Sequence, residues 1–86
     1  MSVTHNIGKT EKAEMYLKAI LLIGHENPPV TVTKVAEFLG VSPASVSEMV
    51  KRMEANDLVI NTGTRLMLTE TGLQDARKLV RRMRLA

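Results

Sequence analysis

Apolar residues recur at intervals of three and four in four stretches of the chain. An α-helix makes one turn in about 3.6 residues, so each stretch predicts a helix with one buried side. We expect helices over residues 11–24, 34–39 and 43–55, and a last helix from Glu70 onward. Their predicted core residues are Tyr16, Ala19, Ile20 and Ile23 in the first helix, Val35, Ala36 and Leu39 in the second, Val46, Met49, Val50 and Met53 in the third, and Leu73, Ala76, Leu79, Val80 and Met83 in the last.

Residues that favour helix ends lie at both ends of these segments. Gly24 is expected to end the first helix, because the segment from His25 to Pro29 contains two prolines that prevent its continuation. Gly40 supplies the left-handed residue that commonly follows a helix. The predicted N-caps are Thr10, Thr33, Ser42, which is followed by Pro43 at the first helical position, and Thr69.

Short β-branched and apolar runs predict the remaining elements. Val30 to Val32 fits a short edge strand. Leu58 to Ile60 and Arg65 to Leu68 read as two strands joined by the turn Asn61 to Thr64, which makes a β-hairpin. The expected fold is mainly α with this small hairpin. It is a winged helix-turn-helix, with the helix-turn-helix at 33–56 and the wing at 58–68.

Composition limits the kind of protein this chain can be. With 86 residues, 44% of them hydrophobic and 24% charged, we expect one domain over residues 1–86, with residues 1–9 as a flexible arm. There is no cysteine, which excludes disulfides and thiolate chemistry. The apolar run from Ala19 to Ile23 is far shorter than the roughly 20 residues that cross a bilayer. We therefore expect a cytoplasmic protein with no membrane partner.

The titratable and hydroxyl side chains show no catalytic arrangement. His5 and His25 are far apart in the sequence, and neither has acidic partners at the spacing of a transition-metal site. No histidine or lysine is positioned to activate a serine, and there is no glycine-rich phosphate loop. We expect neither an enzyme nor a cofactor bound by this chain.

The third helix has one apolar side and one polar side, as a helix that reads DNA does. Small residues at its start allow close approach to a groove, where hydroxyls and the helix N-terminus favour phosphate. Lys51 and Arg52 can reach a phosphate or a guanine edge, and Glu48 can accept from a cytosine amino group. Arg65, at the wing turn, suits the minor groove or flanking phosphates. The predicted contacts to double-stranded DNA are Thr33, Ser42, Pro43, Ala44, Ser45, Ser47, Glu48, Lys51, Arg52 and Arg65.

The net charge of +3 is concentrated at the end of the chain. Residues 1–72 hold seven Lys and Arg against eight Asp and Glu, whereas residues 73–86 hold five against one. This basic segment is either a solvated helix face or a surface that contacts phosphate.

Three segments resemble, in the same order, the N-terminal domain of the diphtheria-toxin-repressor family. They run from Glu14 to Ile20, from Val35 to Glu54 and from Leu68 to Gly72. The members are metal-dependent transcription repressors with iron-sensing and manganese-sensing branches. The resemblance implies a DNA-binding repressor and places five of the residues above on the DNA side: Ser42, Ser45, Ser47, Glu48 and Arg52.

The same resemblance implies a changed metal site. Met15 matches a ligand position of the iron-sensing branch, but Lys18 stands where manganese sensors have a glutamate and Met83 where the family has a histidine. In full-length relatives the metal is iron(II) or manganese(II), and the other ligands lie in a C-terminal dimerisation domain. We expect DNA binding without metal, by a monomer or weak homodimer. A dimer would require a palindromic operator.

Two other functions remain open from the sequence. A winged helix can serve as a protein-interaction module that does not bind DNA directly, and the balanced charge of the third helix favours that alternative. Within DNA-binding proteins, a regulator of the multiple-antibiotic-resistance type is the rival family, although that group has additional flanking dimerisation helices.

Overall fold

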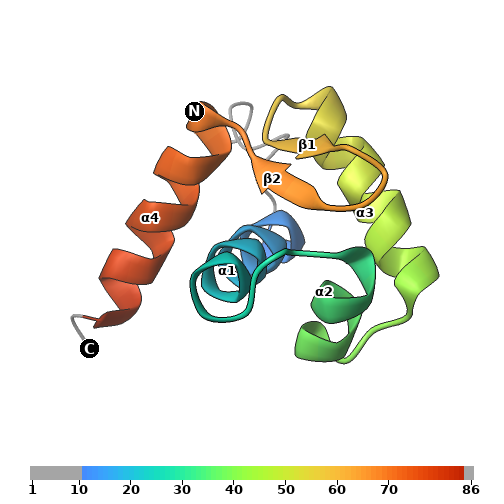
Figure 1. Ribbon diagram of the computed structural model, residues 1–86. Coiled ribbons are helices and arrows are strands. Elements are labelled where there is room, and N and C mark those ends of the chain that lie inside the picture. The colour runs from blue at the N-terminus through green and yellow to red at the C-terminus, as the bar shows by residue number, and fades with distance from the viewer. Residues whose placement is uncertain (1–10, 85–86) are drawn as a thin grey trace.

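The computed structural model describes the backbone of residues 11–84 and the side chains of residues 11–81. Within that range the predicted winged-helix architecture is confirmed. Figure 1 shows α1 in the middle of the molecule, with α4 on one side and α2, α3 and the hairpin on the other. No helix in this range is long and apolar enough to cross a membrane. The elements are α1 (Glu11–Glu26), α2 (Val32–Leu39), α3 (Pro43–Ala55), β1 (Val59–Asn61), β2 (Leu66–Leu68) and α4 (Glu70–Arg84).

The end of α1 differs from the sequence prediction. The helix does not stop at Gly24 but continues to Glu26, and the Asn27 amide still donates to the Ile23 carbonyl over 2.7 Å. Glycine lowers helix stability by only about 1 kcal/mol, whereas the residue before a proline is driven away from helical angles. Pro28 therefore sets the end of the helix. The predicted cap Thr10 and the predicted arm 1–9 lie outside the described residues.

The start of α2 also differs from the prediction. Thr31 is the N-cap, with its hydroxyl accepting from the Lys34 amide over 3.1 Å, and the predicted cap Thr33 lies inside the first turn. Starting at Val32 places Val32 on the same face as Val35, three residues later, and lets it pack on the core. The predicted strand at 30–32 is consequently absent, although the Val30 carbonyl accepts from the Leu66 amide over 2.9 Å.

One hydrophobic core lies between the helices and beneath the hairpin. Tyr16 brings a polar atom, its hydroxyl oxygen, into this core, and its side chain is 2% exposed. Burial raises the pKa of the hydroxyl. That hydroxyl makes no hydrogen bond to the rest of the described chain. The predicted core face of α3 is confirmed, and that of α1 also includes Leu17. The largest fully buried side chains are Tyr16, Leu17, Val35, Val46, Val50 and Met53.

The hairpin forms close to its predicted position. Its strands are antiparallel with Ile60 opposite Met67, and each begins one residue later than predicted. In the turn, the Gly63 amide donates to the Asn61 side-chain oxygen over 2.9 Å, and Gly63 has a positive φ of 96°. Both residue types are common in turns. Asparagine side chains hydrogen-bond to nearby backbone amides, and glycine adopts positive φ angles without steric cost.

The start of α4 is fastened to the end of the α3–β1 connection. Thr69 is the predicted cap: its hydroxyl accepts from the Gly72 amide over 3.0 Å and donates to the Asp57 carbonyl over 2.6 Å. Its own amide donates to the Leu58 carbonyl over 3.0 Å. Gly72 is buried so closely against this strand entry that a Cβ atom there would overlap the Leu58 carbonyl oxygen. The start of α4 and the entry to β1 are therefore in direct contact.

We predict that Gly72→Ala destabilises the domain by about 1–3 kcal/mol, because the methyl group must displace a backbone carbonyl rather than a flexible side chain. Urea unfolding followed by circular dichroism measures the change. Gly24→Ala is the matched control: its Cβ lies 3.4 Å from a Val30 methyl, an ordinary contact, so it should stabilise α1 slightly. Equal midpoints for the two variants would contradict the close approach.

Candidate nucleic-acid interface

The exposed side of α3 is determined by the side that α3 buries. Val46 and Val50 are 0% exposed and Met53 is 1% exposed, so the opposite side of the helix faces solvent. The predicted surface residues on that side are exposed, with the exception of Ser45, which is half-buried. The exposed ones are Ser42, Pro43, Ala44, Ser47, Glu48, Lys51 and Arg52.

Ser42 and Ser45 form the N-terminal cap of α3. The Ser42 hydroxyl accepts from the Ser45 amide over 3.1 Å and donates to the Ser45 hydroxyl over 3.0 Å. Pro43 occupies the first helical position, as predicted. The Ser47 hydroxyl, one turn into the helix, makes no hydrogen bond within the described part of the chain. The start of α3 therefore presents small polar groups and the positive end of the helix dipole to solvent.

Lys51 and Arg52 lie further along the same exposed side. Neither side chain makes an ion pair or a hydrogen bond with any residue between 11 and 81. Their positive charges are therefore available to an external anion. Glu48 is exposed one turn before Arg52 and can only accept hydrogen bonds when ionised.

The hairpin is held against the C-terminal part of α3. The Asn61 amide donates to a Glu54 carboxylate oxygen over 3.3 Å, which joins the last turn of α3 to the end of β1. Arg65 follows the turn and is exposed. Its backbone makes three hydrogen bonds with Thr62, two with the hydroxyl and one with the amide. Sequence analysis did not predict the role of Glu54, because no local pattern connects two residues seven positions apart on different elements.

α2 lies at the other end of α3. Figure 1 shows α2 beside the N-terminal end of α3 and the hairpin beside its C-terminal end. Thr33 is exposed in the first turn of α2. Phe38 and Val41, which flank the turn into α3, are 54% and 37% exposed, although sequence analysis assigned them no surface role. The predicted DNA-binding residues thus sit on three neighbouring elements.

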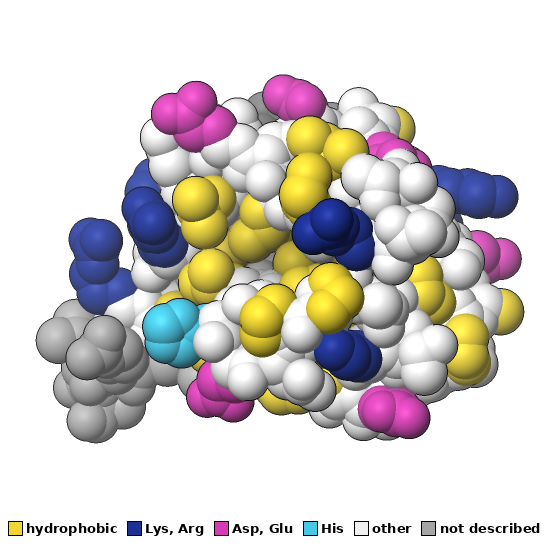
Figure 2. Space-filling model, in the orientation of Figure 1, with side chains coloured by type: hydrophobic (Ala, Val, Ile, Leu, Met, Phe, Trp, Pro, Cys, Tyr) yellow, Lys and Arg dark blue, Asp and Glu magenta, His cyan; other side chains and the backbone are white. Residues whose placement is uncertain are grey.

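The basic residues of α4 occupy a different part of the molecule. Arg77, Lys78 and Arg81 are exposed, and α4 lies across α1 from α3. Figure 2 shows cationic side chains gathered over α4, at the border of an apolar hollow. The charge excess of the last segment is therefore separate from the exposed side of α3.

The described residues near Met15 do not fit a divalent metal ion. Met15 is 47% exposed on α1, and Lys18, one turn later, places a positive charge on the same helix. The described residues contain no group of three His, Cys, Asp or Glu side chains that could hold a metal. A thioether alone is a weak ligand for a hard or borderline divalent ion. The side chain of Met83 lies outside the described residues.

Comparison with known families agrees with the fold. The family described as iron dependent repressor, N-terminal DNA binding domain, matches residues 9–65, which contain α1, α2, α3 and β1. A comparison with curated proteins gives no significant match. Because the family match covers well over half of the 86 residues, the chain belongs to the iron dependent repressor family, whose N-terminal DNA binding domain it contains.

Proposed function

We propose that this domain binds double-stranded DNA in a sequence-specific manner as part of a transcriptional repressor, with α3 in the major groove. The observation that supports this most is the exposed side of α3, whose two cations have no partner in the described chain. An α-helix with side chains is about 10–12 Å across, and the major groove is about 12 Å wide. The small residues at the start of α3 would then let it enter deeply.

The roles of individual residues follow from their reach. Arg52 can form paired hydrogen bonds to a guanine edge, and Lys51 is long enough for the backbone phosphates. Glu48 would accept from a cytosine amino group, and Ser47 would bond to base or phosphate. Ser42, Pro43, Ala44 and Ser45 would place the positive end of α3 against the backbone.

The flanking elements would supply contacts outside the major groove. Arg65 in the wing would reach the minor groove or the phosphates beside it. Thr33 in α2 would donate a hydrogen bond to a phosphate. Because Glu54 holds the hairpin against α3, the wing and α3 would meet the duplex with a fixed spacing.

The expected partner is a palindromic operator when two copies bind side by side. Two α3 helices would then enter successive major grooves about 34 Å apart. If two copies bind together, the operator affinity would depend on protein concentration.

A protein-interaction module is the alternative function. The balanced charge of α3, with Lys51 and Arg52 against Glu48 and Glu54, and the exposed Phe38 favour it. Salt separates the two functions, because binding to phosphates weakens linearly in log salt whereas an apolar interface responds little.

We predict that Arg52→Ala and Lys51→Ala weaken DNA binding without changing the fold. Loss of one phosphate contact should lower the salt slope by about one for all sequences, and loss of a base contact should cost about 1–3 kcal/mol at one base pair. Fluorescence anisotropy with a duplex selected from a randomised pool, at about 50 and 200 mM salt, measures both quantities.

Arg77→Ala and Lys78→Ala on α4 remove the same residue types from the other side of α1 and should leave DNA affinity nearly unchanged. If the α4 pair weakened binding and the α3 pair did not, α3 would not be the DNA-binding helix. If no variant mattered and salt had little effect, the protein-interaction alternative would stand.

We also predict that DNA binding by this chain does not depend on iron(II) or manganese(II). Metal can strengthen DNA binding only by binding the DNA-competent state more tightly, and the described residues around Met15 offer too few ligands. Anaerobic titration of each metal during an anisotropy experiment tests this. A tightening of about tenfold or more at micromolar metal would show a functional site.

A further inference from the structure

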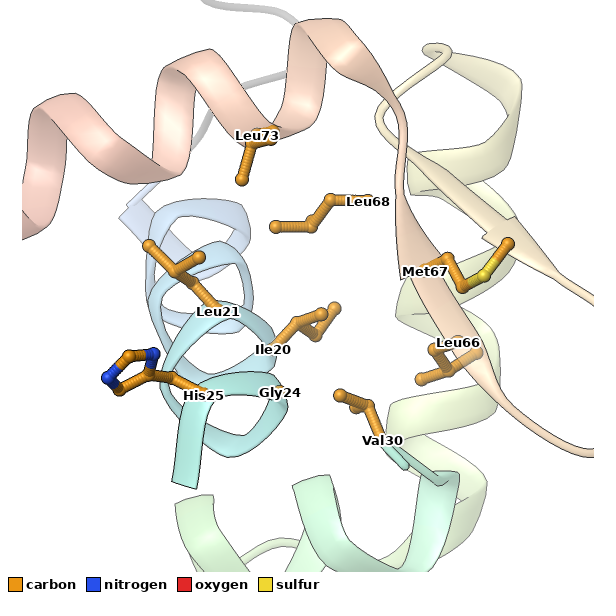
Figure 3. A pocket seen from close by; sticks show the side chains of 9 residues that line it. All are labelled: Ile20, Leu21, Gly24, His25, Val30, Leu66, Met67, Leu68 and Leu73. Carbon is orange, nitrogen blue, oxygen red and sulfur yellow. The ribbon is translucent and has the colours of Figure 1, made fainter. Parts of the chain in front are cut away.

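An apolar hollow opens between α1, β2 and the start of α4, away from α3. Its volume is about 330 Å³. Figure 3 shows Ile20, Leu68 and Leu73 entering it from these three elements. Leu68 and Leu73 are only half-buried, and Met67 on its border is 42% exposed. The core thus leaves an apolar surface uncovered at this place.

The border of this hollow is positively charged on the α4 side. Arg77 is exposed one helical turn after Leu73, so both lie on the same side of α4. His25, one turn after Leu21 on α1, is exposed and also lines the hollow. Residues 70–84 hold five Lys and Arg against two Asp and Glu, a net charge of +3 that equals the charge of the whole chain. Figure 2 shows cationic side chains over α4 beside apolar side chains.

Size and charge together define the kind of ligand that fits. The hollow is open to solvent and has a volume of about 330 Å³. That volume is at the lower end of the range of ligand pockets, which suits a small molecule better than a protein helix. An apolar body of this size with an anionic end would match both the walls and the border.

We propose that the hollow between α1, β2 and α4 binds a small amphiphilic carboxylate, with the apolar chain against Leu68 and Leu73 and the carboxylate beside Arg77. Removal of apolar surface from water supplies the attraction, and the cationic border selects the sign of the head group. The proposal does not depend on DNA binding, because the hollow and α3 use different surfaces.

The test is an NMR titration of the chain with sodium decanoate, kept below its micelle-forming concentration and without DNA. We expect saturable shifts at Leu21, Leu68 and Leu73, with a dissociation constant of about 1 mM or lower. Decyltrimethylammonium has the same chain and the opposite charge, and it should bind at least about threefold more weakly.

Two substitutions that change the net charge by the same amount test the position of the head group. Arg77→Glu should weaken decanoate binding at least about threefold. Lys78→Glu is the control, because it lies about 100° further around α4 and faces away from Leu73. Met67→Gln, on the exposed side of the hairpin, should weaken binding of either amphiphile.

Three results would overturn the proposal. The first is the absence of saturable shifts, and the second is equal binding of decanoate and decyltrimethylammonium. The third is binding only to anionic vesicles or micelles, which would make this surface a membrane contact instead. Any of these three results would leave the assignment of α3 unaffected, and loss of DNA binding in the α3 variants would leave this proposal unaffected.

Discussion

The burial of one side of α3 is the constraint on which the rest of this structure depends. Val46, Val50 and Met53 are removed from solvent almost completely, so rotation of α3 about its axis would expose them and bury charged residues. Burying a side chain of this kind is worth about 1.5–3 kcal/mol, and burying an unpaired charge costs several kcal/mol. The orientation of the side that carries Lys51 and Arg52 is therefore a consequence of core packing. No further interaction is needed to direct the proposed DNA-binding side chains toward solvent.

Contacts at both ends of α3 convert that orientation into a fixed surface. At its start, Ser42 caps the helix directly after the turn from α2. At its end, Glu54 accepts from the Asn61 amide, and Thr69 ties α4 to the carbonyl of Asp57. Asp57 itself has a φ of 61°, a conformation that aspartate tolerates better than most residues. These bonds connect the hairpin to the end of α3 and the start of α4 to the α3–β1 connection.

Local signals predicted the fold, and long-range contacts decided the places where the prediction was wrong. Gly40 and Ser42 each act through their own neighbours, and both are where the sequence placed them. The choice of Thr31 over Thr33 as a cap depended on whether Val32 could pack on the core, which no local pattern reveals. The bond between Glu54 and Asn61 and the hollow beside Leu73 arise between elements distant in sequence. The exposed side of α3 was predictable because it is the complement of a periodic apolar pattern.

The central claim is that α3 and the wing, and not α4, form the DNA-binding surface. The most direct measurement is the change in backbone amide chemical shifts when the chain is titrated with a DNA duplex that it binds. The account predicts the largest changes over residues 42–52 and 62–65, with a smaller group at the start of α2 and little change over residues 77–81. Changes centred on residues 77–81, with α3 unaffected, would contradict it and would assign DNA binding to the basic side of α4.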